Sequence, residues 1–215
     1  MDLPLDMSAQ LSSPLLLPMV MFVFVSSITP GPNNVMLTAS GANFGYQRSV
    51  PHMLGITFGG VFMLLMVGAG LGAMFTQLPW LYTALQAIGA VYLLWLAWKI
   101  ATSGQVGRVD AKPRPLNFWQ AAAFQWVNPK AWLMSVGVVA AYTSPQAYWP
   151  SLLLGMLVML VVNYPCISVW TLFGSAVRRW LQSPRALQWF NWTMAGLLLL
   201  SLWPMVAGWL PQGGA

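Results

Sequence analysis

The chain has 215 residues, of which 58% are hydrophobic and only 6% are charged, and its mean hydropathy is +0.67. Soluble domains carry about 25% charged residues, so this composition excludes a soluble protein and indicates an integral membrane protein. A membrane-spanning helix needs about 20 apolar residues, so the length allows about six such helices and no large soluble domain. The net charge of +6 comes from basic residues scattered between apolar runs, which excludes the basic stripe of a nucleic-acid-binding protein.

Hydropathy and helix-breaking residues predict six membrane-spanning helices and therefore an all-α fold. In chain order, the predicted spans cover residues 15–39, 50–75, 81–101, 118–142, 149–177 and 189–209. The segment before the first span lacks the basic stretch of a secretory signal, and the apolar run continues past a proline cluster. We therefore expect the first apolar run, residues 15–39, to be a retained span and not a cleaved signal.

The basic residues predict which connections face the cytoplasm. They lie in or beside the first, third and fifth connections: Arg48, Lys99, Arg108, Lys112, Arg114, Arg178, Arg179 and Arg185. By the positive-inside rule these connections are cytoplasmic, so both termini are expected outside. The one basic residue that departs from this pattern is Lys130, near the middle of the fourth span.

The six spans divide into two halves of three, residues 1–105 and 106–215, which enter the membrane from opposite sides. The motif TPGPNN interrupts the first span of the first half, and VNPKA interrupts the first span of the second. Gly55 follows Pro30 by nearly the same interval as Gly155 follows Pro129. Interrupted helices at matching positions of two inverted halves predict a transporter with its site near the bilayer midplane.

The two interruptions contain the predicted site. Proline removes a backbone donor and clashes with the preceding turn, so neither span is expected to continue as one helix. In a membrane, such backbone is tolerated only where protein or a water-filled cavity surrounds it. Thr29 and Asn128 are capping residues directly before proline, so we expect a helix to begin at each break with amides free for a substrate carboxylate. The predicted substrate-binding residues are Thr29, Pro30, Gly31, Pro32, Asn33, Asn34, Asn128, Pro129 and Lys130.

Each of these residue types has an expected role in substrate binding. The asparagine side chains supply amide donors and acceptors for an ammonium group or a polar side chain, and Gly31 lets a ligand approach the backbone. Lys130 is either a cation that attracts a carboxylate or a lysine that reaches the membrane surface from the end of a shorter helix. A purely structural proline kink is the alternative for either break.

Two further residues are candidates for coupling or a secondary role. His52 begins the second span, where it is either an interfacial side chain or a proton carrier. Asn163 precedes Tyr164 and Pro165, so it either caps a local break or bonds to another helix. Glycines at four-residue spacing in the second span, Gly55, Gly59, Gly68 and Gly72, predict close helix packing.

Other classes of function lack the residues that they need. Cys166 is the only cysteine and His52 the only histidine, which excludes an internal disulfide, a redox cysteine pair and a cysteine-rich metal site within one chain. Neither an HExxH motif nor a pair of intramembrane carboxylates is present for catalysis. We therefore expect no enzyme, no cofactor and no bound metal. The expected partners are a small amino acid and the lipid bilayer. The sequence does not decide whether the protein forms a homo-oligomer.

The segment TPGPNNVMLTASGANFGYQRSVPHMLGITFGG, together with FWQAAAFQWVNPKAW and the glycine-led third and sixth spans, resembles the LysE/RhtB family of amino-acid exporters. The similarity covers nearly the whole chain, and TPGPNN and WLAWKIATS are most similar to the cysteine/O-acetylserine exporter branch. The resemblance implies a six-span antiporter of the bacterial inner membrane, in which the termini that the basic residues place outside are periplasmic. Its expected cargo is small amino acids or derivatives, either cysteine- and O-acetylserine-like or threonine-, homoserine- and leucine-like, and its expected driving force is the proton gradient.

One departure from the family pattern affects the coupling mechanism. Many members have aspartate after the glycines of the second span, where this chain has Gly60, and no predicted span contains a carboxylate. Four alternatives then remain for proton coupling: through His52, through Lys130, through the substrate amine, or no coupling at all. The alternative function is a passive channel or facilitator for small zwitterionic solutes.

Overall fold

The computed structural model describes residues 14–71, 77–102, 114–178, 180–181 and 183–203. Within these ranges the chain is helical and contains no strand, so the predicted all-α fold class is confirmed. The α-helices are α2 (Leu16–Ile28), α3 (Pro32–Phe44), α4 (Tyr46–Met66), α6 (Pro79–Ala101), α7 (Phe118–Phe124), α8 (Pro129–Tyr142), α9 (Tyr148–Val177) and α10 (Pro184–Leu200). Short helical segments continue or join them: η1 (Val67–Leu71), η2 (Gln125–Val127) and η3 (Pro145–Ala147).

Among the described residues, three helices are long and apolar enough to cross a membrane: Tyr46–Leu71, Thr83–Ala101 and Pro145–Val177. The pair α2 and α3 makes a fourth when it is taken as one broken span, bent by 54°. These four correspond to the first, second, third and fifth predicted spans.

Of the other two predicted spans, the fourth is broken as expected and the sixth is described only in part. Residues 118–142 form α7, η2 and α8 in succession, because the proline-containing break divides the segment. Helix α10 ends at Leu200, and residues 204–209 of the sixth predicted span lie outside the described residues, as do residues 72–75 of the second.

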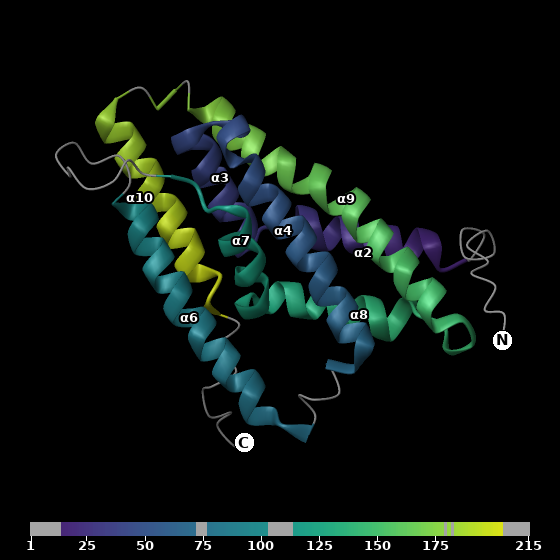
Figure 1. The fold of residues 1–215 in the computed structure, drawn as a ribbon. Helices are drawn as coiled ribbons and strands as arrows, with labels where there is room; N and C mark the ends of the chain where they lie inside the picture. Colours follow the sequence, from purple (N-terminus) through teal and green to yellow (C-terminus); the bar gives the residue numbers. More distant parts are fainter. Residues whose placement is uncertain (1–13, 72–76, 103–113, 179, 182, 204–215) are drawn as a thin grey trace, which may run out of the picture.

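Glycines set the closest helix crossings. The long helix α9 lies against α2, α3 and α4 (Figure 1). Where α3 crosses α9, a Cβ on Gly41 would overlap the Thr171 carbonyl oxygen, and a Cβ on Gly174 would overlap the Thr38 carbonyl oxygen. Helices in lipid associate by close packing of this kind, since the lipid tails are as apolar as the side chains.

The glycines of the second predicted span also permit close packing, as expected. Any Cβ on Gly55 or Gly59 would overlap backbone atoms of α7, which packs across α4. Gly68 faces the side chain of Leu152 on α9, whereas Gly72 lies outside the described residues.

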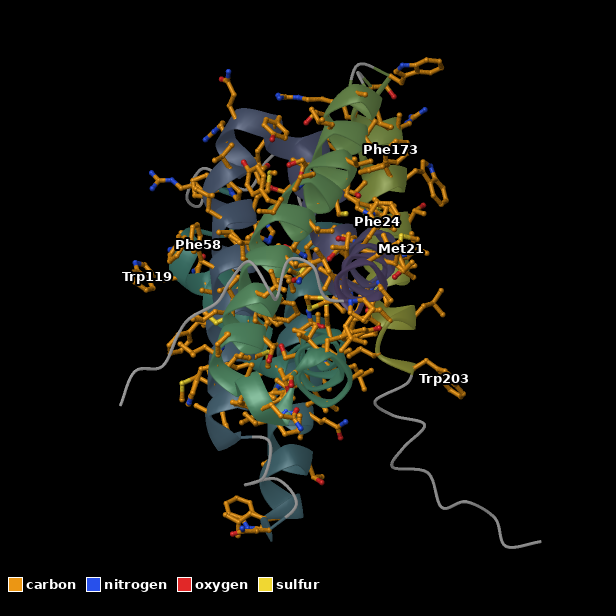
Figure 2. All side chains as sticks on the ribbon, turned by 90° about the vertical axis from the view of Figure 1, so that its right-hand side faces the viewer. Met21, Phe24, Phe58, Trp119, Phe173 and Trp203 are labelled. Atoms are coloured by element: carbon orange, nitrogen blue, oxygen red, sulfur yellow. The ribbon has the colours of Figure 1, made fainter. Side chains whose placement is uncertain are left out.

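The exterior of the bundle is apolar, and amides lie inside it. Figure 2 shows large apolar side chains pointing away from the helices: Met21, Phe24, Phe58, Trp119, Phe173 and Trp203. The buried polar side chains include Asn34, Gln125, Asn128, Asn163 and Asn191. A lipid-facing surface around a partly polar interior is the arrangement expected for a multi-pass membrane protein.

Candidate functional site

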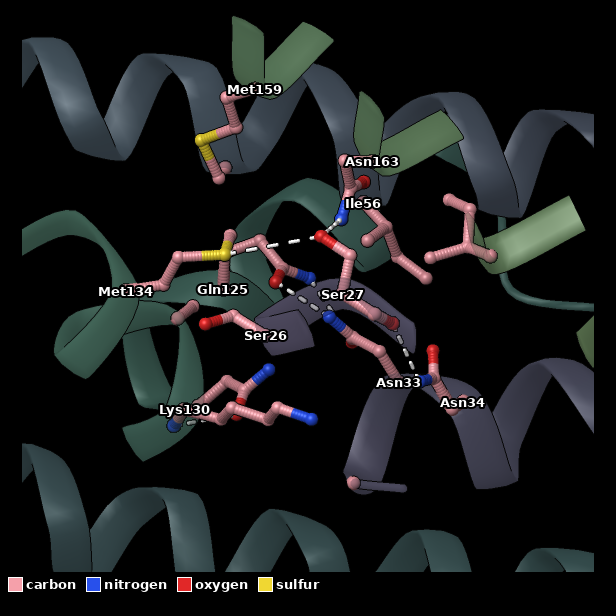
Figure 3. Close-up of a pocket in the computed structure, with 15 residues that line it drawn as sticks. Ser26, Ser27, Asn33, Asn34, Ile56, Gln125, Lys130, Met134, Met159 and Asn163 are labelled. Carbon is pink, nitrogen blue, oxygen red and sulfur yellow. Dashed lines mark hydrogen bonds between the residues drawn. The ribbon is translucent and has the colours of Figure 1, made fainter. Parts of the chain in front are cut away.

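A cavity of about 40 Å³ lies where the two broken segments meet (Figure 3). Of the predicted substrate-binding residues, five line it: Gly31, Asn33, Asn34, Asn128 and Lys130. Thr29, Pro30, Pro32 and Pro129 form the breaks themselves. The structure therefore brings together two motifs that lie about a hundred residues apart in the chain.

The carbonyl groups freed at the end of α2 all find donors. The Asn34 side-chain amide donates to Ser27 O at 2.9 Å and to Thr29 O at 2.8 Å. The Trp170 indole N–H donates to Ile28 O at 3.0 Å. Because a helix end buried in a membrane protein must satisfy its last carbonyls, these side chains make the break stable.

Lys130 supplies the remaining donors. Its ammonium nitrogen lies 2.7 Å from Thr29 O, 2.9 Å from Thr29 Oγ1 and 3.1 Å from Pro30 O. A cation at the C-terminal end of α2 also complements the negative end of the helix dipole. Lys130 therefore links the second break to the first, and its predicted role in binding a carboxylate stays a prediction.

Gly31 makes room for this lysine. A Cβ at position 31 would lie 2.9 Å from Lys130 Cδ and 3.3 Å from Lys130 Nζ. The Lys130 side chain therefore fills the space beside Gly31, which the sequence predicts to be open to a ligand.

The two helices that begin at the breaks have different N-termini. At α3, Gly31 is the N-cap, no described side chain caps the helix, and Pro32 has no amide hydrogen. The amides of Asn33 and Asn34 then have no acceptor within the helix. At α8, Asn128 accepts from Lys130 N through its side chain and from Ala131 N through its carbonyl. The predicted capping role of Thr29 is wrong, because Thr29 ends α2 and α3 begins at Pro32. The expectation of free amides holds for α3 and is wrong for α8, because Asn128 caps that helix itself.

Gln125, which the sequence motifs did not indicate, pairs with Asn33 across the cavity. Asn33 Nδ2 donates to Gln125 Oε1 at 2.9 Å, and Gln125 Nε2 donates back to Asn33 Oδ1 at 3.3 Å. Gln125 Nε2 also donates to Ala121 O at 2.9 Å. The available signal was an amide within a predicted span, three residues before the Asn-Pro pair, since such an amide needs a partner in the membrane.

Asn163 of α9 connects its own helix to α2 and α4. Its Nδ2 donates to Ser27 Oγ on α2, and its Oδ1 accepts from Thr57 Oγ1 on α4, both at 3.1 Å. Helix α9 continues through Pro165. The interhelical alternative for Asn163 is therefore confirmed, and the alternative of a local break is wrong.

His52 is enclosed by protein, with only 2% of its surface exposed, so it is not the exposed interfacial side chain that was one alternative. Neither ring nitrogen has a hydrogen-bond partner among the described residues. Ile56, one helical turn further along α4, lines the cavity. His52 thus lies on the same face of the helix as the cavity without contributing to its wall.

The chain matches the family "LysE type translocator" over residues 24–202, a stretch that contains both breaks and every described cavity residue. The chain belongs to the LysE type translocator family. Membership of this family makes the protein a transporter and not an enzyme. It also confirms the resemblance that the two proline motifs indicated.

Curated relatives of this LysE-family protein carry a common name. The "Cysteine/O-acetylserine efflux protein" of Escherichia coli (strain K12) is 31% identical over 160 residues, which are 74% of this chain and 81% of that protein. The protein of the same name from Salmonella typhimurium (strain LT2) is 28% identical over 159 residues, with the same two shares. No solved structure matches the chain.

Proposed function

We propose that this LysE-family protein is a secondary transporter that exports small amino acids or their derivatives across the bacterial inner membrane. The observation that carries the proposal is the uncapped N-terminus of α3, which opens on the cavity beside the Asn33–Gln125 pair. A helix N-terminus favours a carboxylate, and side-chain amide oxygens accept hydrogen bonds from an ammonium group. Together they match the two charges of a zwitterionic amino acid.

Binding requires the cavity to open. A volume of about 40 Å³ holds a few water molecules and no amino acid. The Asn33–Gln125 pair closes the space between the two broken segments, so a bound ammonium would take the place of one of its hydrogen bonds. Opening of this pair is the local step that the proposal requires.

An inverted repeat supplies the larger movement. Each proposed half begins with a segment broken before proline, α2–α3 in the first and α7–α8 in the second. The contacts between the halves are also matched. The second span of the first half, α4, packs against the first helix of the second half, α7, and the second span of the second half, α9, packs against the first helix of the first half, α2. This correspondence supports two inverted halves that rock about the cavity and expose it to each side in turn.

The orientation follows from the basic residues. Arg48 near the start of α4, Lys99 near the end of α6 and Arg178 at the end of α9 belong to the side proposed as cytoplasmic. Both termini then lie in the periplasm. The names of the relatives make cysteine and O-acetylserine the first substrates to test, with threonine, homoserine and leucine as further members of the panel.

Counterflow in proteoliposomes tests the transport proposal. We expect unlabelled cysteine or O-acetylserine inside the vesicles to accelerate uptake of the labelled compound, with saturation at high concentration. A passive channel would give unsaturable uptake that the internal substrate does not accelerate. If every amino acid in the panel behaved as in protein-free vesicles, the proposal would be rejected.

Replacing Asn33 or Gln125 by alanine is expected to reduce counterflow by about tenfold or more. Each change removes a group placed to bind the charged ammonium, and such a hydrogen bond contributes about 1.5–3 kcal/mol. The measurement is the initial rate of counterflow at a fixed amount of folded protein.

Asn43→Ala is the matched control for these two variants. Asn43 forms the same reciprocal amide pair with Asn191, at 2.9 and 3.3 Å, but neither residue lines the cavity. We expect this variant to transport at nearly the wild-type rate. Equal losses in Asn33→Ala and Asn43→Ala would show that amide pairs stabilise the bundle in general and do not bind substrate.

Proton coupling through His52 is the second part of the proposal. The described residues contain no aspartate or glutamate, and His52 is buried with both ring nitrogens unpartnered among them. We expect His52→Asn to retain counterflow but to lose accumulation driven by a pH gradient, because an amide cannot carry the proton. Gradient-driven accumulation equal to wild type in His52→Asn would assign the coupling elsewhere.

A further inference from the structure

We infer that Met159, seated against Gly60, sets the largest substrate side chain that the cavity accepts. The inference rests on the proposed transport of amino acids and adds a specificity-determining contact to it. Its evidence is the position of the Met159 methyl group, which is independent of the motifs in the two breaks.

The cavity has two chemically different walls. Its polar wall contains Asn33, Asn34 and Gln125, which belong to the two broken segments. Its mainly apolar wall contains Ile56 of α4, Met134 of α8 and the α9 residues Met159 and Ile167. The one amide of α9 at this wall, Asn163, is already bonded to Ser27 and Thr57. Figure 3 shows Met134 and Met159 on the side of the cavity away from Asn33 and Asn34. An amino acid held by its charged groups at the polar wall would direct its side chain toward the methionines.

Met159 limits the depth of the apolar side. A Cβ on Gly60 would lie 2.7 Å from Met159 Cε, so the methyl group occupies the space that any side chain at position 60 would need. Both residues are buried and both line the cavity. Because position 60 has no side chain, the Met159 methyl group can pack directly against the backbone of α4.

The flexibility of methionine makes this contact adjustable. Its unbranched thioether chain fills irregular space and changes rotamer at low cost. A short substrate side chain leaves the Met159 methyl group in place, whereas a longer one must displace it. In an apolar pocket, one methylene group more or less changes discrimination by about tenfold or more.

The test compares leucine with cysteine as counterflow substrates of the full-length protein in proteoliposomes. Met159→Ala removes the limiting atoms, so the ratio of the leucine rate to the cysteine rate is expected to rise about tenfold. Gly60→Ala pushes the Met159 methyl group into the cavity, so the same ratio is expected to fall about tenfold. The opposite directions of the two changes distinguish a size limit from general damage to the protein.

Met63→Ala is the control, since Met63 is an equally buried methionine of α4 that does not line the cavity. Its leucine-to-cysteine ratio should equal that of wild type. If Met159→Ala does not fold, Gly60→Ala decides alone through the direction of its change. Unchanged ratios in the variants that transport would overturn the inference while leaving the transport proposal intact. An inactive wild type would instead reject the transport proposal itself.

Discussion

Replacing Lys130 by methionine is expected to abolish amino-acid exchange and to lower the free energy of unfolding by about 1–3 kcal/mol. The ammonium group donates to Thr29 O, Thr29 Oγ1 and Pro30 O, and methionine keeps the length of the side chain but none of the donors. Thr29 O retains its bond from Asn34, whereas the Pro30 carbonyl loses the donor found for it. Thermal unfolding in detergent and counterflow in proteoliposomes measure the two effects.

Lys99→Met is the matched control for the loss of a positive charge. Lys99 Nζ lies 4.5 Å from the centre of the Trp95 ring near the end of α6, away from the breaks. An exposed cation–π contact of this kind contributes only about 0.5–1 kcal/mol, so exchange should continue. If Lys130→Met matched Lys99→Met in both stability and transport, the link between the breaks would have no functional importance.

Gly174→Ala is expected to have the largest effect on stability, a loss of about 3 kcal/mol. A single methyl group at this position would overlap the Thr38 carbonyl oxygen, which belongs to the backbone of α3 and cannot turn aside. The helix propensity of alanine favours the substitution by only about 1 kcal/mol, so the overlap dominates. The yield of monodisperse protein and its melting temperature in detergent measure the loss.

The control for this substitution is Gly196→Ala in α10. Among the described atoms, none lies within 4 Å of a Cβ built on Gly196, so the added methyl group meets open space. We expect unchanged or slightly higher stability, by up to about 1 kcal/mol, from helix propensity alone. A melting temperature for Gly174→Ala equal to that of Gly196→Ala would mean that α3 and α9 can separate at no cost.

The contacts at the breaks also indicate what must change during transport. Lys130 and the Asn33–Gln125 pair connect the first broken segment to the second. If the proposed halves rock against each other, these hydrogen bonds lengthen together, and substrate groups are placed to replace them. At the crossing of α3 and α9 the glycines bring the two backbones together, and the Thr38 and Ser175 hydroxyl groups each donate to the other helix, so we expect the crossing to open as a unit or not at all.

Local chemistry in the sequence determined where the helices break and which class of protein this is. The clustered Pro30 and Pro32 and the Asn128–Pro129 pair indicated the two breaks, and Asn128 caps the helix that begins beside it as predicted. The single prolines inside α4 and α9 do not break those helices. Low charge and long apolar runs determined the membrane class in the same way. Each of these conclusions depends on a residue and its near neighbours in the chain.

Only the tertiary structure decided which polar groups find one another. Lys130 donates to backbone oxygens about a hundred residues earlier in the chain, and Gln125 pairs with Asn33. Asn163 forms hydrogen bonds with Ser27 and Thr57. Sequence spacing shows that such groups need partners in a bilayer but cannot choose among several equivalent partners. The choice depends on the glycine crossings, which set how closely the helices approach and therefore which side chains come within hydrogen-bonding distance.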